Sequence, residues 1–443
     1  MRRTAAPGQR GWHAPPPGRG HLAYRTTPAA LVAFVVPLLL VLATYAGQSA
    51  TTEPPTHHAP ATKLPTLPQI DYHALDIQRT VNWQLAHMTL DEKLGQLFLI
   101  ETVWQHYNSD VDNMVRGMHA GTMIVYNQNI SDQQQLHDYL AAVQAHASLP
   151  LLISTDEEGG LVDRLAQFMP SRPSAQDVAS SGNPNVARQE AAGMAQDLLA
   201  LGINADLAPV VDVRTTPAAV EYTRLFGDDP ATVDRFAGAF LDGVQQNGVV
   251  GCLKHWPGIG SVTLDPHETL PTIDRSLGDL QSTEFAAFKN LLGHQPGMIM
   301  VTHVIVSALD PSLPATLSPK VVDGVLRGQL GYQGVVMTDS LYMKGISVRY
   351  SLGEAAVLSI IAGDDLLEGA WDTGSMQEML GAIKQAMAQG RISAQRIDQS
   401  VARVLTLKAR YGLIPLRIVR PDHGGSVGQQ MAAAQEADLP RSA

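Results

Sequence analysis

The residues best suited to chemistry lie in one segment, Lys254 to Pro271, which reads KHWPGIGSVTLDPHETLP. Its Gly and Pro content indicates a long shaped loop rather than a helix. Asp265 stands two residues before His267 in this loop. A carboxylate bonded to an imidazole fixes the tautomer of the ring and raises its basicity, so the pair could donate a proton to a leaving group and later take one from water. The alternative is that the pair only holds the loop in shape.

A metal site is a second interpretation of this loop, with Asp265, His267 and His255 as ligands. The sequence has no tight paired motif such as H-E-x-x-H around these residues. Cys252 is the single cysteine, which excludes an intrachain disulfide framework and a cysteine-cluster metal site. We therefore predict no metal.

Other polar residues follow short apolar runs along the chain: Asp156, Asp212, Lys254, His255, His303 and Asp339. Taken singly, each could be a capping residue or a core residue with its hydrogen bonds satisfied. If the apolar runs are strands of one barrel, however, their ends form a single mouth on which these side chains converge. Such convergence is what a catalytic site requires.

The elements that must position these residues alternate along the chain. Apolar runs occur at 94–100, 121–127, 149–155, 203–211, 248–255, 297–304, 334–340 and 362–369. Ala-rich stretches with helical spacing, such as 187–202 and 375–390, lie between them and end in Gly, as helix C-termini often do. This alternation predicts an α/β fold with parallel strands. Eight units favour a single closed (β/α)8 TIM-type barrel over an open doubly wound sheet.

Composition and charge narrow the classes of function. The 443 residues include 31 Lys and Arg against 42 Asp and Glu, a net charge of −11, which argues against nucleic acid as a partner. A hydrophobic fraction of 45% with 16% charged residues is typical of a folded globular protein.

The first 50 residues differ from the rest, because they carry five arginines and no acidic residue. The apolar run 29–46 is close to the minimum of about 17 residues that cross a bilayer. We interpret residues 1–50 as a signal peptide or an uncleaved N-terminal membrane anchor. The positive-inside rule then places everything after Gly47 outside the cytoplasm, so we expect a protein that is secreted or anchored to the cell membrane by residues 29–46.

Three further segments complete the expected organisation. Residues 51–70 are rich in Pro and Thr and predict an extended linker. Residues 71–414 are the expected barrel. Residues 415–443 are polar, contain Gly and lack a sustained period, which predicts a disordered tail.

Six segments together resemble glycoside hydrolase family 3, and within it the bacterial β-N-acetylglucosaminidases of the NagZ type. In chain order they are DEEGG at 156–160, INADLAPVVDV at 203–213, RLFGDDP at 224–230, KHWPGIG at 254–260, DPH at 265–267 and GVVMTDSL at 334–341. The resemblance covers about residues 75–414. It implies a (β/α)8 barrel that hydrolyses terminal β-linked N-acetylhexosamine with retention of configuration and without a cofactor.

The resemblance also implies roles for individual residues. Asp339 corresponds to the family's nucleophile, and His267, assisted by Asp265, corresponds to its acid/base. A retaining glycosidase needs one group to attack the anomeric carbon and another to protonate the departing oxygen. Contacts to sugar hydroxyls fall on Asp156, Arg224, Lys254 and His255, with Arg164 and His303 as further candidates.

Three positions depart from the family pattern. Glu157 stands where the family usually has Gln, Leu161 where it has Arg, and Ile259 where it has a second His. None of the three removes a proposed catalytic group, but Leu161 and Ile259 change the expected lining of the substrate subsites.

The expected function is removal of terminal β-linked N-acetylglucosamine from cell-wall or chitin-type oligosaccharides, including muropeptides of peptidoglycan turnover, through a covalent glycosyl-enzyme. Some family members are β-glucosidases whose second domain supplies the acid/base, and the sequence after Tyr411 is too short for such a domain. Alternatives that stay open are a glycoside phosphorylase, another family 3 β-glycosidase, a non-catalytic surface glycan-binding protein and a metal-dependent barrel hydrolase.

Overall fold

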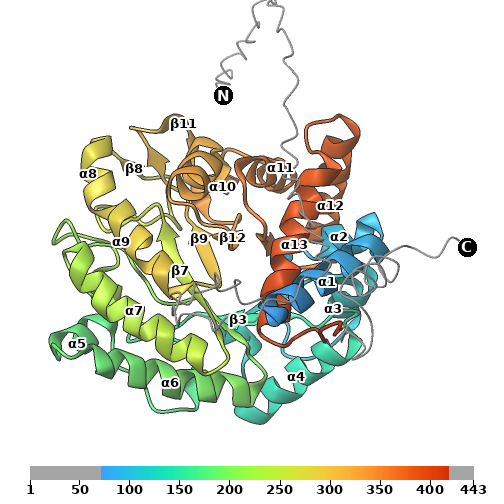
Figure 1. Cartoon of the computed structure of the whole chain (residues 1–443), viewed down its shortest axis with the longest axis horizontal. Coiled ribbons are helices and arrows are strands. Elements are labelled where there is room, and N and C mark those ends of the chain that lie inside the picture. Colours follow the sequence, from blue (N-terminus) through green and yellow to red (C-terminus); the bar gives the residue numbers. More distant parts are fainter. Residues whose placement is uncertain (1–70, 419–443) are drawn as a thin grey trace, which may run out of the picture. The chain divides into compact units, whose positions relative to one another are not determined.

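The computed structural model describes residues 71–418 of the chain (Figure 1). The predicted signal peptide or anchor at 1–50, the predicted linker at 51–70 and residues 419–443 of the predicted tail lie outside the described residues. Between residues 71 and 418, no helix is long and apolar enough to cross a membrane.

Eight parallel strands form the centre of the fold. They are β1 Phe98–Ile100, β2 Thr122–Val125, β3 Leu152–Thr155, β6 Ala205–Asp206, β7 Val250–Trp256, β9 Met298–Val301, β12 Val335–Thr338 and β13 Leu367–Ala370. Their order is β12-β9-β7-β6-β3-β2-β1-β13, and every neighbouring pair is parallel. A parallel bridge between Met337 and Leu366 brings β12 beside β13 and closes the sheet. The predicted barrel is confirmed, and the open doubly wound sheet is excluded.

Each predicted apolar run overlaps one of these strands, but the bounds differ, and β7 and β13 each extend one residue beyond their runs. In the first run, 94–100, Leu94 and Gly95 belong to a helix and only Phe98–Ile100 is strand. The run 203–211 holds the two-residue strand β6 and then an irregular chain with one further bridge, from Val210 to Lys254. Apolar composition marks a buried segment but does not fix where its backbone pairs.

Helices surround the barrel (Figure 1). They are α1 Tyr72–His87, α2 Leu90–Gly95, α3 Ser109–Asp112, α4 Gln133–His146, α5 Ala175–Ser180, α6 Pro184–Leu201, α7 Pro230–Gln246, α8 Leu277–Ser282, α9 Glu284–Leu291, α10 Lys344–Ser347, α11 Leu352–Ala362, α12 Thr373–Ala388 and α13 Ala394–Arg410. The crossover from β9 to β12 is a π-helix, η7 Lys320–Gln329. The first helix, α1, packs against the last, α13.

Local sequence explains where these helices begin and end, and α6 is an example. Asn183 caps its first turn by accepting the backbone N–H of Asn185, and Pro184 occupies the first helical position. Gly202 ends it with a φ of 87°, a left-handed conformation that favours glycine. The predicted helix 187–202 is thus confirmed apart from its first turn.

Two buried clusters show how the barrel is filled. The smaller one takes alternate residues from strands all around the barrel, among them Leu99, Ile124, Leu152, Cys252, Met300, Met337 and Leu366. Side chains on a strand alternate between its two faces, so this cluster is the interior of the barrel. The larger cluster includes the intervening strand residues, such as Phe98, Met123 and Ile153, together with the helices.

Two small sheets lie outside the barrel and were not predicted. One is an antiparallel hairpin of β4 Glu157–Gly159 and β5 Val162–Asp163, directly after β3. The other contains β8 Thr272–Ile273, β10 Ile305–Val306 and β11 Asp310–Pro314. Because β8 pairs with β10, it anchors the far end of the loop that carries His267.

Candidate active site

A cavity of about 450 Å³ opens at the carboxyl ends of the strands. Seven of the nine predicted site residues line it: Asp156, Arg164, Arg224, Lys254, His255, His267 and Asp339. Asp265 lines a smaller cavity of about 110 Å³ that shares Asp339 and His267 with the first. The convergence expected from the sequence is therefore present.

The period of the strands explains why several of these side chains meet. Interior positions recur every second residue, so the first polar residue beyond the apolar interior faces the same space. Five polar residues stand in this way two positions after an interior apolar residue: Asp339 after Met337, Lys254 after Cys252, Tyr126 after Ile124, Glu368 after Leu366, and Glu101 after Leu99.

Asp339 follows directly after β12 and is held at both oxygens. Thr302 Oγ1 donates to Oδ2 at 2.8 Å, and the backbone N–H of Ser340 donates to Oδ1 at 2.9 Å. Burial raises the pKa of this carboxyl, but nearby histidines, His303 foremost, and the Thr302 hydroxyl lower it below its ordinary value. Asp339 is therefore ionised at neutral pH, as a carboxylate nucleophile must be.

A charged network forms another part of the wall. Lys254 Nζ lies 2.7 Å from Asp156 Oδ1 and 2.6 Å from Glu158 Oε1. Arg224 donates to both oxygens of Glu158, at 2.7 and 2.8 Å. Burial raises the pKa of Glu158, but Arg224 and Lys254 outweigh this and hold it well below its ordinary value. Glu158 is therefore charged, and the network presents fixed donors and acceptors to the hydroxyl groups of a ligand.

His255 is held by two buried carboxylates. Its Nδ1 lies 2.8 Å from Asp212 Oδ2 and 3.4 Å from Glu221 Oε2. Burial lowers the pKa of the imidazole, but Glu221 and Asp212 raise it above its ordinary value. The ring is therefore fixed in orientation at the cavity wall.

The same three residues, Asp212, Glu221 and His255, place possible metal-ligating atoms within 4.8 Å of one another. The guanidinium of Arg224 is bonded to Glu221 and lies 3.5 Å from His255 Nε2. A divalent cation would thus sit beside a fixed positive charge, which repels it. We interpret these residues as a hydrogen-bonded cluster that positions His255.

The predicted pair of His267 and Asp265 is formed. His267 Nδ1 lies 2.8 Å from Asp265 Oδ1, and the same oxygen accepts the backbone N–H of His267 at 2.9 Å. The side chain of His267 is 66% exposed, which places it at the mouth of the cavities. Because Asp265 engages Nδ1, Nε2 is the nitrogen available to a ligand.

The two weaker candidates are placed differently from each other. Arg164 lines the larger cavity, where Nη2 donates to Asp156 Oδ2 at 3.4 Å and Nη1 donates to Asn127 Oδ1 at 3.1 Å. His303 is fully buried, with Nδ1 2.8 Å from Thr316 Oγ1 and Nε2 2.8 Å from the Ser340 carbonyl oxygen. It lines neither cavity, so the structure does not support the predicted sugar contact for His303. Its contact with Ser340 instead makes it a positioning residue for the segment that carries Asp339.

The structure adds residues to the site that were not predicted from the sequence, among them Tyr126, Glu158, Glu101 and Glu368. Glu158 belongs to the DEEGG segment, but only its contacts with Lys254 and Arg224 show its importance. Glu101 accepts the Ser340 hydroxyl at 3.2 Å, and Glu368 accepts the Tyr126 hydroxyl at 2.5 Å. The two-residue step beyond the interior apolar positions is the pattern that would have indicated Tyr126, Glu101 and Glu368.

The three departures from the family pattern also have definite places. Glu157 is fully buried, and its Oε2 accepts the backbone N–H groups of Arg164 and Leu165 at 2.8 and 3.2 Å. Leu161 is 79% exposed at the turn between β4 and β5. Ile259 lines the smaller cavity, and its backbone N–H donates to Asp212 Oδ1 at 2.8 Å.

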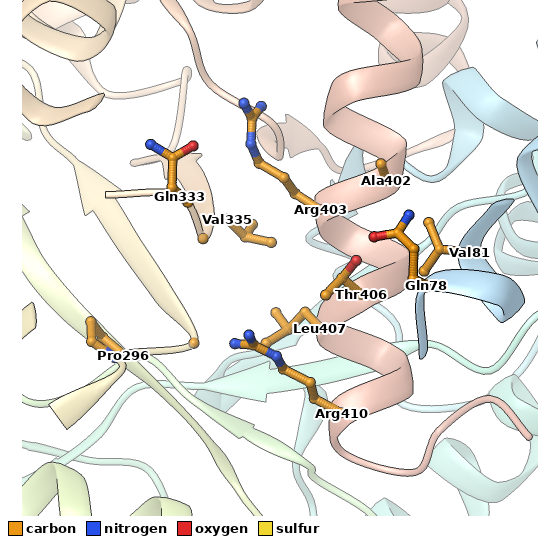
Figure 2. Close-up of a pocket in the computed structure, with 12 residues that line it drawn as sticks. Gln78, Val81, Pro296, Gln333, Val335, Ala402, Arg403, Thr406, Leu407 and Arg410 are labelled. Atoms are coloured by element: carbon orange, nitrogen blue, oxygen red, sulfur yellow. The ribbon is translucent and has the colours of Figure 1, made fainter. Parts of the chain in front are cut away.

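A separate cavity of about 230 Å³ lies at the other end of the strands. Figure 2 shows Arg403, Thr406 and Arg410 on α13 together with Pro296 and Gln333, which precede β9 and β12. Arg403 Nη1 donates to the buried Asp365 at 3.0 Å. The amino ends of the strands in such a barrel serve stability rather than catalysis, so this cavity is not the candidate active site.

Comparison with known proteins points to one family. Residues 89–407 match the family described as "Glycosyl hydrolase family 3 N terminal domain". The β-hexosaminidase LpqI of Mycobacterium tuberculosis is 34% identical over 330 residues, which cover 72% of this chain and 82% of that protein.

Solved structures show the same likeness. A family 3 β-N-acetylglucosaminidase from Paenibacillus sp. FPU-7 has a TM-score of 0.72 and 33% identity, covering 79% of this chain and 68% of that one. A family 3 glycosyl hydrolase from Mycobacterium smegmatis has a TM-score of 0.68 and 33% identity, covering 75% of this chain and 99% of that one. The chain is a glycoside hydrolase and belongs to glycoside hydrolase family 3.

Proposed function

We propose that this chain is an exo-acting β-N-acetylhexosaminidase that removes terminal β-linked N-acetylglucosamine through a covalent glycosyl-enzyme. One observation carries the proposal: the ionised carboxylate Asp339 and the carboxylate-bonded imidazole His267 line the same two adjoining cavities. The names of the relatives, a β-hexosaminidase and a β-N-acetylglucosaminidase, support the choice of sugar.

In the first step, Asp339 attacks the anomeric carbon, and the bond from that carbon to the glycosidic oxygen breaks. His267 donates the proton of Nε2 to the departing oxygen, so the leaving group is a neutral alcohol. Asp265 stabilises the protonated imidazole before the transfer, since it accepts a hydrogen bond from Nδ1.

In the second step, the imidazole of His267 takes a proton from water while the water oxygen attacks the anomeric carbon. The bond to Asp339 breaks, and the carboxylate is restored. Two displacements at one carbon retain its configuration. The exposure of His267 suits this step, because water reaches the ring from the mouth.

The smaller cavity supports an acetamido group beside the reacting carbon. Its lining combines Asp339 with the apolar side chains of Val220, Ile259 and Met343. A substituent on the carbon next to the anomeric carbon would enter this space, with its methyl group against the apolar side chains. A volume of about 110 Å³ is large enough for an acetamido group.

The proposed substrates are cell-wall or chitin-type oligosaccharides, including muropeptides, outside the cytoplasm. The basic leader and the apolar run 29–46 support the location. Fractionation of cells that express the full chain tests it: an anchor predicts activity in the membrane fraction, and a cleaved signal predicts activity in the secreted fraction. Activity confined to the cytoplasm would contradict both.

Hydrolysis of a panel of p-nitrophenyl glycosides tests the activity. We expect turnover of the β-N-acetylglucosaminide, and its loss to background in Asp339→Ala because the covalent step is removed. His267→Ala should lose more activity on substrates with poor leaving groups than on a dinitrophenyl glycoside, which departs without a proton.

A matched control is available in the chain. His294 also pairs with a carboxylate, Asp242, at 2.8 Å, but it lies before β9 at the other end of the barrel. His294→Ala should therefore keep wild-type turnover. Ordinary turnover in Asp339→Ala would show that the nucleophile is assigned wrongly.

Adding phosphate to the same assay separates hydrolysis from phosphorolysis. A hydrolase releases free N-acetylglucosamine at a rate independent of phosphate. Formation of sugar 1-phosphate would instead establish the phosphorylase alternative. Binding of the sugar by folded protein without any turnover would establish the non-catalytic alternative.

A further inference from the structure

Two side chains of the larger cavity have no role in the mechanism above. The hydroxyl of Tyr126, which follows β2, donates to Glu368 Oε1 on β13 at 2.5 Å. Both residues line the cavity together with Asp339. Oε2 of Glu368 has no hydrogen-bond partner among residues 71–418. A buried polar atom without a partner is unfavourable, and a ligand hydroxyl could supply the missing bond.

Glu368 is neutral in this setting. Burial raises the pKa of its carboxyl well above the ordinary value, and the neighbouring Glu101 and Asp339 raise it further. Within residues 71–418 the side-chain partners of Glu368 and Glu101 are hydroxyl groups, Tyr126 and Ser340, and not cations. A neutral carboxyl can donate one hydrogen bond and accept another, so together with Tyr126 it suits a hydroxyl group.

The order of strands around the barrel shows which part of the sugar these residues would meet. The anomeric carbon lies at Asp339, after β12. The smaller cavity that suits the acetamido group is lined by Asp339 and Met343 after β12 and by residues after β9, on β7 and after β6, the latter all on the β9 side of β12. Lys254 of β7 and Asp156 after β3, which are paired at 2.7 Å, would then meet the next ring positions. Going round the pyranose in this orientation, the carbon that bears the hydroxymethyl group would come last, at β2, β1 and β13, which the strand order places next to β12 again.

We propose that Glu368, held by Tyr126, binds the hydroxymethyl oxygen of the terminal sugar and makes this enzyme specific for an uncharged, hydroxyl-bearing substituent at that position. The inference rests on the proposed function, because it uses the orientation of the bound hexosamine. It also has a consequence for charged sugars. With Glu101 and Asp339 beside Glu368, a carboxylate or phosphate on the hydroxymethyl carbon would be repelled.

The test compares p-nitrophenyl N-acetyl-β-glucosaminide with its 6-deoxy analogue. Wild-type protein should prefer the 6-hydroxyl substrate by at least about tenfold in kcat/KM, since a site built to bind a hydroxyl leaves buried polar groups unpaired when the hydroxyl is missing. Glu368→Leu should bring that ratio towards about one. Glu368→Gln should keep most of the preference, because the amide is neutral and both donates and accepts.

Two further variants show whether a change in the ratio comes from the site or from damage to the fold. Tyr126→Phe removes only a hydroxyl and should lower the same ratio through Glu368. Glu354→Leu, at an exposed glutamate paired with Arg391 on the outer surface, is the matched control and should leave the ratio unchanged. An equal preference in wild-type and Glu368→Leu, or no preference in the wild type, overturns the inference.

A binding measurement distinguishes failure of this inference from failure of the proposed function. If folded wild-type protein hydrolyses neither glucosaminide, calorimetric binding of N-acetylglucosamine and of its 6-deoxy analogue replaces turnover as the readout. Tighter binding of the 6-hydroxyl sugar by wild type but not by Glu368→Leu then supports the inference, and equal binding overturns it.

Discussion

Glu157 shows how burial changes the chemistry of one residue. Its Oε2 accepts two backbone N–H groups, its Oε1 has no partner among residues 71–418, and the carboxyls of Asp163 and Asp206 lie close by. Burial, with Asp163 and Asp206, raises the pKa of Glu157 to about 9. At neutral pH the side chain is therefore an uncharged group with the shape of glutamine, the residue usual in the family.

We predict that Glu157→Gln stabilises the protein increasingly as pH rises. A carboxyl whose pKa is raised in the folded state costs stability between its unfolded pKa, about 4.5, and its folded pKa, about 9. Glutamine has no such dependence. Unfolding by denaturant at several pH values should show almost no difference near pH 5 and a gain on the order of a few kcal/mol near pH 9. A difference that is constant across this range would contradict the assignment of a neutral Glu157.

The loop from 257 to 271 is the element that brings His267 to the site, and it depends on close packing at Gly260. A Cβ at this position would overlap the carbonyl oxygen of Val213. The backbone N–H of Thr215 also donates to the Gly260 carbonyl at 3.1 Å. The loop therefore lies directly against the segment after β6.

We predict that Gly260→Ala lowers kcat more than it raises KM. The loop must move away from Val213, which displaces His267, while the charged network of Lys254, Asp156, Glu158 and Arg224 still binds the sugar. The loss should be on the order of tenfold or more. Gly293→Ala is the control, because a Cβ there meets nothing within 4 Å. Wild-type kinetics in Gly260→Ala would show that the position of this loop does not limit the reaction.

Helix α13 carries a buried lysine. Lys408 is fully buried, and its Nζ donates to Gln96 Oε1 at 2.7 Å. Burial lowers the pKa of Lys408 to about 7. The ammonium group of the unfolded chain must therefore lose its proton, or be buried with its charge, when the protein folds near neutral pH.

We predict that Lys408→Met raises the free energy of unfolding at pH 7 by on the order of 1–3 kcal/mol, even though Gln96 loses its donor. For a lysine with a lowered pKa, the wild type recovers stability as pH rises from about 7 towards 10.5. The gain should therefore shrink between pH 7 and pH 10. Lys289→Met, at an exposed position of α9, should change little at either pH.

The elements were predicted better than their contacts. Hydrophobic period and Gly at helix ends indicated the barrel, because these patterns depend on residues near one another in sequence. The pairing of Glu158 with Arg224 joins positions 66 residues apart, and the pairing of Tyr126 with Glu368 joins positions 242 apart. Such pairs depend on barrel register, which local sequence does not fix.

At the scale of the whole molecule, the described residues contain a complete barrel. The first helix, α1, packs against the last, α13, and α13 contributes buried Val401 and Leu405 to the main core. Asp365, just before β13, is bonded to Ser400 and Arg403 of α13 at 2.6 and 3.0 Å. The helix therefore belongs to the same cooperative unit as the strands.

We predict that a protein limited to residues 71–418 unfolds in one transition and hydrolyses the chromogenic substrate with the kcat/KM of the full chain. Circular dichroism on heating and the glycoside assay measure the two properties. A shorter protein that also lacks α13 should fail to fold, because its removal exposes the core and leaves Asp365 without two of its partners. Loss of activity in the 71–418 protein would mean that other segments take part in the site.

At the scale of the whole molecule, too, the sequence predicts where the site residues gather but not which contacts each of them makes. That polar residues gather at one mouth follows from the topology, and Asp339, His255 and Lys254 were predicted on that ground. His303 shows the limit of this prediction. A histidine at a strand end can point away from the cavity, and the hydrogen bonds of His303 to Thr316 and Ser340 hold it in that orientation. Only the packed structure determines which face of a strand end remains open.

The closure of the barrel has one further consequence. β12 pairs with β9 along four residues, whereas the segment that leads into β13 meets β12 through one bridge and a few backbone hydrogen bonds, such as that from Thr338 to Leu366 at 3.0 Å. Asp339 and Glu368 lie on the two sides of this seam. Transient opening there, as amide hydrogen exchange reports it, would separate the reacting carboxylate from its neighbour while the helices stay intact. Loss of activity on warming that precedes the loss of helical circular dichroism would show that this seam, rather than the whole fold, limits the durability of the catalyst.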